Sequence, residues 1–193
     1  LVAAILEAGD LGRFEREVSL FARTPALVSA LAPSGSLRGS QQRALDAFIA
    51  AQDAQPDTIR SIGHDALAAA TPSAAKMVRS VSLVLLRRRW PSSTLHITCV
   101  DTSTGERCVI DASAGIPIAR AVAASSAVPG IFSPQPIGDR RCMDGGVSGS
   151  GTHLDLVAGA DGVVVLSLLD GHGDGAGGMT QAPSAYRTEL AAL

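Results

Sequence analysis

Aromatic residues are scarce in this sequence of 193 residues, and neither sign of charge prevails. Phe, Trp and Tyr together make up 3 % of the chain, too few to supply the stacking platforms that bind single-stranded nucleic acid. The 16 Lys and Arg are balanced by 18 Asp and Glu, so a net charge of −2 creates no overall positive field. We therefore expect no nucleic-acid partner.

Cysteines are also few, and long apolar runs are missing. Cys99, Cys108 and Cys142 are odd in number and lie in apolar surroundings, unlike the dense, even sets of small secreted proteins. This favours a reducing compartment, and we expect a cytoplasmic protein with free thiols. The apolar run Ser80–Leu86 ends at Arg87-Arg88-Arg89, far short of the roughly 20 residues of a spanning helix.

Peripheral contact with a membrane surface stays open at the end of that run. Arg87-Arg88-Arg89-Trp90 follows an apolar helical pattern and could touch lipid headgroups. Three arginines at the C-terminal end of a helix also complement the helix dipole, and we take this as the default interpretation.

The composition is that of one folded domain, with 46 % hydrophobic and 18 % charged residues. Apolar residues recur at helical spacing through most of the first ninety residues. A loop is expected at Ala32–Ser40, where glycine, proline and serine are concentrated. The helices expected in this half are Leu1–Ala8, Leu11–Phe21, Gln41–Gln52, one after Pro56 that contains Ile59, Ile62 and Ala66, and Lys76–Arg89.

The second half mixes strands with helices. Leu95–Val100 alternates and Arg107–Ile110 is apolar, and the turn-forming residues between them predict a β-hairpin. If Asp101 and Glu106 pair, Cys99 and Cys108 face each other. Pro117 opens a further helix that Pro129 must end, and two more strands are expected at Ile137–Met143 and Val163–Leu169. The last is a near-continuous apolar run of the kind found in a parallel sheet, so the pattern predicts an α/β fold.

Three segments in this half combine turn-forming residues with polar side chains. Ser125-Ser126-Ala127-Val128-Pro129-Gly130-Ile131-Phe132 predicts a helix end that turns sharply into a loop. In Met143-Asp144-Gly145-Gly146, two glycines after a strand let the backbone turn tightly, which aims the Asp144 carboxylate at a neighbouring element. Gly159-Ala160-Asp161 leads into the last apolar run.

In this order and spacing, the three segments resemble the patatin-like phospholipases of bacterial type, which are serine acyl hydrolases with a three-layer α/β/α fold. The resemblance extends to the hairpin of residues 95–110, and Leu1–Gly9 is similar to the helix that follows the nucleophile of the family. It implies a Ser–Asp dyad without histidine, in which Asp144 of the Asp144-Gly145-Gly146 motif accepts the serine proton. It also implies a lipid or ester substrate and a role in lipid metabolism. We expect neither a cofactor nor a metal, since no set of residues has a diagnostic ligand spacing.

The nucleophile of the family lies in a G-x-S-x-G elbow, and the sequence contains none. Gly146-Val147-Ser148-Gly149-Ser150 is one residue out and lies on the wrong element. The glycine-rich oxyanion loop is absent as well. We therefore expect an N-terminally truncated chain that begins just after the elbow and is inactive alone. Residues 1–170 would form the partial hydrolase domain, and residues 171–193 a glycine-rich linker with a terminal helix.

Several residues have rival interpretations. Ser125 and Ser126 lie at a helix end, where small hydroxyls usually bond to local backbone, so we take them as structural. His153 permits a Ser–His–Asp triad with Asp144, and His153, Asp155 and Asp144 permit a metal site, although neither spacing is diagnostic. Gly173–Gly178 fits G-x-G-x-x-G but opens no helix promptly, which favours a linker. A non-catalytic lipid-binding or interaction module on a degenerate hydrolase fold is the alternative function.

Overall fold

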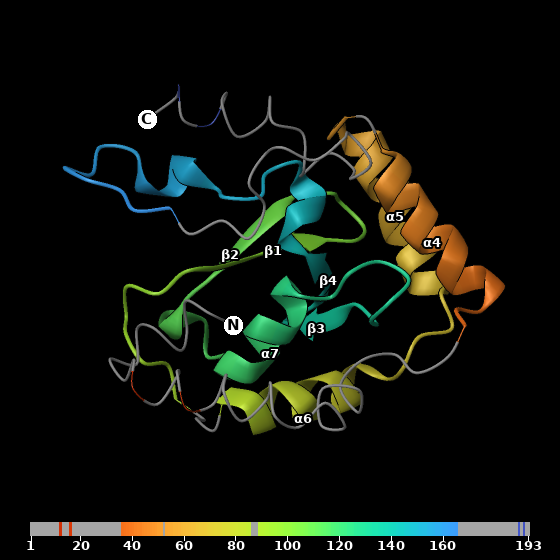
Figure 1. Ribbon diagram of the computed structural model, residues 1–193, viewed down its shortest axis with the longest axis horizontal. Helices are drawn as coiled ribbons and strands as arrows, with labels where there is room; N and C mark the ends of the chain where they lie inside the picture. The colour runs from red at the N-terminus through yellow and green to blue at the C-terminus, as the bar shows by residue number, and fades with distance from the viewer. Residues whose placement is uncertain are drawn as a thin grey trace.

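The computed structural model describes residues 36–51, 53–85 and 89–165, together with the single residues 12, 16, 189 and 191 (Figure 1). Several sequence predictions fall outside these residues and stay predictions. They are the helices at residues 1–8 and 11–21, the first four residues of the loop at residues 32–40, the glycine-rich segment 171–178, and most of the terminal helix 184–193.

Three helices in the first part of the described chain confirm the helical periodicity. They are α4 (Gly39–Ala50), α5 (Pro56–Ala68) and α6 (Ala74–Leu85). Pro56 occupies the first turn of α5, where its fixed φ suits a helix and its missing N–H costs nothing. Ile59, Ile62 and Ala66 are buried on one face of α5, as the spacing predicted. Figure 1 shows α4 and α5 lying side by side as a pair.

A four-stranded sheet follows, in the order β2-β1-β4-β3. Its strands are β1 (Ile97–Asp101), β2 (Arg107–Ile110), β3 (Gln135–Ile137) and β4 (Arg140–Asp144). The β1–β2 hairpin is confirmed, and its register places Cys99 opposite Cys108 as predicted. All three strand pairs are antiparallel, so within the described residues the sheet is not the mainly parallel one that the apolar run suggested.

The single strand predicted at residues 137–143 was wrong. The structure has two strands there, β3 and β4, which pair as a hairpin with Ile137 opposite Arg140. Gly138 and Asp139 form the turn, and Gly138 adopts a left-handed φ of +60°. A two-residue Gly-Asp turn of this kind reverses the chain within what looked like one continuous segment.

The helix predicted after Pro117 is confirmed as α7 (Ile118–Ser125), and the described chain also contains three short 3₁₀ helices. These are η1 (Ala112–Ala114), η2 (Gly145–Ser148) and η3 (Leu154–Val157). The last strand predicted, at residues 163–169, is not supported where it can be seen. Val163–Val165 have no strand pairing and Val164 is 89 % exposed, while residues 166–169 lie outside the described part.

Two apolar clusters lie on the two sides of the sheet. Alternate residues of a strand point to opposite faces, so Cys99 and Cys142 pack with α6 and α7 on one side. Val100 and Met143, which are opposite each other in register, pack with α5 and the end of α4 on the other side. The mixture of helices and sheet is an α/β fold. None of the helices in the described ranges is long and apolar enough to span a bilayer.

Candidate functional site

Asp144 is the last residue of β4, and the chain leaves the sheet directly after it. Its backbone N–H donates to the Ala127 carbonyl (3.1 Å), which ties the strand end to the loop after α7. Its side chain caps η2, because Oδ1 accepts the backbone N–H of Gly146 at 2.8 Å. The carboxylate predicted to matter is therefore fixed at a strand end, with one oxygen held by the following turn.

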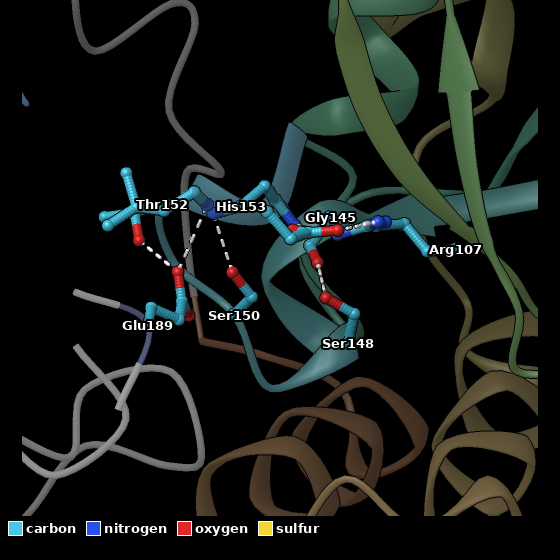
Figure 2. Close-up of polar contacts among 9 residues, drawn as sticks. Arg107, Gly145, Ser148, Ser150, Thr152, His153 and Glu189 are labelled. Carbon is cyan, nitrogen blue, oxygen red and sulfur yellow. Dashed lines mark hydrogen bonds and ion pairs between the residues drawn. The ribbon is translucent and has the colours of Figure 1, made fainter. Parts of the chain in front are cut away.

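The glycine after Asp144 is required by close packing against β1. A Cβ on Gly145 would lie 2.8 Å from both the carbonyl oxygen and Oγ1 of Thr98. Only glycine allows the chain to pass β1 this closely, and the turn that aims Asp144 depends on it. The Ser148 hydroxyl donates to the Gly145 carbonyl (2.9 Å) and closes the 3₁₀ turn, as Figure 2 shows.

Burial is the main electrostatic influence on Asp144. It raises the pKa of the carboxyl from its ordinary 3.8 to about 6, and the Gly146 N–H opposes this shift because it stabilises the charged form. A carboxylate with a pKa of about 6 is ionised at neutral pH, yet it accepts a proton more readily than an exposed aspartate. These are the properties of a general base.

Removing this charge should stabilise the fold at neutral pH. The pKa of Asp144 is higher in the folded chain than in the unfolded chain, so ionisation of this carboxyl lowers the free energy of unfolding. The stability is fully present below the ordinary pKa of 3.8 and is lost as pH rises through about 6. Asparagine can still accept the Gly146 N–H. At about pH 7.5, we expect Asp144→Asn to unfold at a higher urea concentration than the wild type. Below about pH 4, the two unfolding midpoints should be equal. A difference independent of pH would contradict a buried, ionised carboxylate.

The serines suggested as alternative nucleophiles lie at the end of α7 and in η2. Ser125 ends α7, and Ser126 is the C-cap, its backbone N–H donating to Ala124. Ser148 bonds to the Gly145 carbonyl within η2, not in a turn between a strand and a helix. Among the described residues, the hydrogen bond to the Asp144 carboxylate comes from the Gly146 backbone and not from a hydroxyl.

His153 faces Arg107 on β2 (Figure 2). Among the described residues, the side-chain hydrogen bond of Asp144 comes from the Gly146 N–H and not from the His153 ring. His153 Nδ1 lies 3.4 Å from Arg107 Nη1, and the backbone N–H of His153 donates to Ser150 Oγ at 2.7 Å. Burial and then the Arg107 charge lower the pKa of His153, so the ring is neutral at pH 7. This arrangement does not assemble the Ser–His–Asp triad that the sequence left open.

The metal site suggested for Asp144, His153 and Asp155 is not formed in the described part of the chain. Arg107 holds Asp155 in a bidentate ion pair, with Nη1 2.7 Å from Oδ1 and Nη2 2.5 Å from Oδ2. The side chains that do meet with metal-ligand spacing in the described residues are Cys99, Cys108 and Cys142. The facing of Cys99 and Cys108 was predicted, but the approach of Cys142 was missed, because it depends on the pairing of β1 with β4.

The structure adds little to the interpretation of two further sequence motifs, the arginine run before Trp90 and the glycine-rich segment. Arg87 and Arg88 lie outside the described residues, and so does Gly173–Gly178. Trp90, which was considered for membrane contact, donates its Nε1–H to the Ile116 carbonyl (2.8 Å) and packs on the α7 side of the core.

Comparison with known proteins identifies a family. Residues 6–156 match the family model described as Patatin-like phospholipase, which covers well over half of the chain and includes α4 to η2 and the Asp144 turn. No curated protein matches the sequence. No solved structure matches it either.

Proposed function

The chain belongs to the patatin-like phospholipase family, a family of lipid-ester hydrolases, and on this basis we propose that it carries the proton acceptor of a lipid acyl hydrolase. Asp144 is the residue to which we assign that role. The observation that supports it most is the carboxylate itself, fixed at a strand end by Gly146 and with its pKa raised to about 6. The glycine turn that aims it belongs to the matched region.

The proposed reaction has two halves. In the first, the serine hydroxyl gives its proton to Asp144 while Oγ attacks the ester carbonyl, and backbone N–H groups hold the resulting oxyanion. The intermediate collapses to an acyl-enzyme, and the leaving alcohol takes the proton from Asp144. In the second half, water gives a proton to Asp144 and attacks the acyl group. The acid is released and the serine recovers its proton.

We propose that the nucleophilic serine lies outside these 193 residues. The sequence contains no G-x-S-x-G, and the near match at Gly146–Ser150 overlaps the 3₁₀ helix η2, in which the Ser148 hydroxyl donates to the Gly145 carbonyl. On this proposal the oxyanion loop is also supplied from outside. The 193-residue chain alone would then have no esterase activity.

The three-layer α/β/α arrangement and the cellular setting are parts of the same proposal. Apolar clusters on both sides of the sheet support helical layers on both faces. A chemistry carried by serine and aspartate needs neither cofactor nor metal, and its partner is a lipid or simpler ester. Three free thiols accord with a reducing, cytoplasmic compartment.

A non-catalytic lipid-binding module is the second candidate, favoured by the absence of a nucleophile motif from the sequence. The coding sequence directly upstream of Leu1 separates the two. A G-x-S-x-G elbow there supports the hydrolase, whereas an elbow without serine supports the binding module.

An activity measurement on the protein made from its full coding sequence tests the proposal. We expect it to hydrolyse short-chain esters and phospholipid vesicles. Because the base must be ionised, kcat/KM should fall about tenfold for each pH unit below about 6. Binding to vesicles without turnover of any ester would favour the lipid-binding module instead.

A further inference from the structure

Three cysteine thiols from three neighbouring strands meet on the α7 side of the sheet. Cys99 on β1 is opposite Cys108 on β2, and Cys142 on β4 is opposite Asp101 on the other edge of β1. Residues 99 and 101 share a face because strand side chains alternate. All three Sγ atoms lie within 4.8 Å of one another, and all three thiols are free.

The cluster is enclosed on one side and accessible on the other. Cys99 and Cys142 are fully buried in the apolar cluster against α7. Cys108 is half-buried on β2, which is an edge strand of the described sheet. A small ion can therefore reach Cys108 from solvent and be held by the two buried thiols.

A positive charge lies beside the thiols. Arg140 Nη1 is 3.1 Å from Cys108 Sγ, and Arg140 Nε is 3.7 Å from the Asp101 carboxylate. Asp101 itself accepts the Ser103 N–H at 2.8 Å, so its carboxylate is already engaged in the hairpin turn. Within the described residues, the group with metal-ligand spacing consists of three sulfurs, with no carboxylate or imidazole among them.

We propose that Cys99, Cys108 and Cys142 form a binding site for Cu(I). Thiolates are soft ligands that select Cu(I), zinc or iron–sulfur clusters. Structural zinc takes four protein ligands, and the common clusters take four cysteines, whereas three sulfurs suit three-coordinate Cu(I). With metal–sulfur bonds of about 2.3 Å, the sulfurs of a trigonal site are about 4.0 Å apart. The three Sγ atoms lie within 4.8 Å of one another, so each pair needs to approach by less than about 1 Å to bind the ion.

The charges also fit a monovalent ion. Three thiolates around Cu(I) carry a net charge of −2, and the Arg140 guanidinium offsets part of it from the outer shell. The proposal is independent of the hydrolase function, because the thiols take no part in that reaction. It departs from the sequence expectation of no metal, which rested on the spacing of residues along the chain and not on the β1–β4 register.

Cu(I) titration of the reduced, full chain without oxygen tests the site, with a chromophoric Cu(I) chelator as competitor. We expect one Cu(I) per chain and at least about 100-fold weaker binding in Cys108→Ser, which loses a ligand at a half-buried position where serine is tolerated. Arg140→Ala removes the guanidinium beside Cys108 Sγ but keeps all three thiols, and it should weaken binding by about 10–100-fold. Val109→Ser is the matched control, since Val109 is the neighbouring, exposed residue of β2 and the three thiols are retained.

Two results would overturn the proposal. One is wild-type affinity in Cys108→Ser, and the other is tighter binding of Zn²⁺ than of Cu(I) in parallel competition. If a variant fails to fold, X-ray absorption of the copper-loaded wild type decides instead. A first shell of three sulfurs is expected, and a shell of two or fewer would contradict a site made by all three cysteines.

Discussion

Ester turnover should fall by about 10²–10⁴-fold when Asp144 is replaced by asparagine in the protein made from its full coding sequence. Asparagine keeps the shape of the side chain and can still accept the Gly146 N–H, but it cannot take a proton from serine. The loss should appear in kcat, because the carboxylate acts on the reacting proton and not on the rest of the substrate. Steady-state kinetics on a chromogenic ester measure it, and a urea transition verifies that the variant is folded.

Asp155→Asn is the matched control for this experiment. Its carboxylate is half exposed and paired with Arg107, so turnover should be unchanged. His153→Ala tests the rival proton acceptor. Unchanged turnover in Asp144→Asn together with a collapse in His153→Ala would assign the proton to the histidine and reject the Ser–Asp dyad.

The second large effect is expected on stability, at Gly130 in the loop after α7. Gly130 has a left-handed φ of +80°, and a Cβ there would lie 2.1 Å from the Gln41 carbonyl oxygen in α4. Its own carbonyl accepts the buried Gln41 Nε2–H at 3.0 Å, so the loop and α4 are locked in close contact. Gly130→Ala should lower the free energy of unfolding by about 2–4 kcal/mol, through steric displacement and the unfavourable φ together.

Gly138→Ala separates these two causes. Gly138 also has a left-handed φ, +60°, but a Cβ there would meet no atom within 4 Å. Its replacement should cost about 1–2 kcal/mol, from the backbone conformation alone. Urea unfolding of both variants gives the comparison. Equal losses would show that α4 moves away from the loop freely and that the close approach at Gly130 matters little.

Local patterns in the sequence predicted most of the elements that the structure describes. Helical spacing located α4, α5 and α7, and the turn between residues 101 and 106 gave the register of the first hairpin. The β3–β4 hairpin was missed although Gly138-Asp139 is a recognised two-residue turn, because residues 137–143 were interpreted as one strand ending at the Asp144-Gly145-Gly146 turn. Turn chemistry was the better guide at that point.

Features that depend on pairing between distant segments could not be predicted. An apolar run such as Val163–Leu169 indicates burial, but it cannot tell whether a neighbouring strand is available, and Val164 is in fact exposed. Asp144 could be proposed from the sequence because its carboxylate and glycines are consecutive and stand in an ordered set of segments that resembles the family. The meeting of Cys142 with Cys99 depends on a register between strands about forty residues apart, which no local pattern reveals.

Labelling with a fluorophosphonate probe, followed by peptide mapping, tests the division of labour between Asp144 and a serine outside this chain most directly. The protein made from its full coding sequence and its Asp144→Asn variant would be compared. We predict stoichiometric labelling of one serine outside the 193 residues, and much slower labelling of that serine in the variant, because the probe reacts with a serine whose proton has an acceptor. Stoichiometric labelling of Ser125, Ser126 or Ser148 would contradict it.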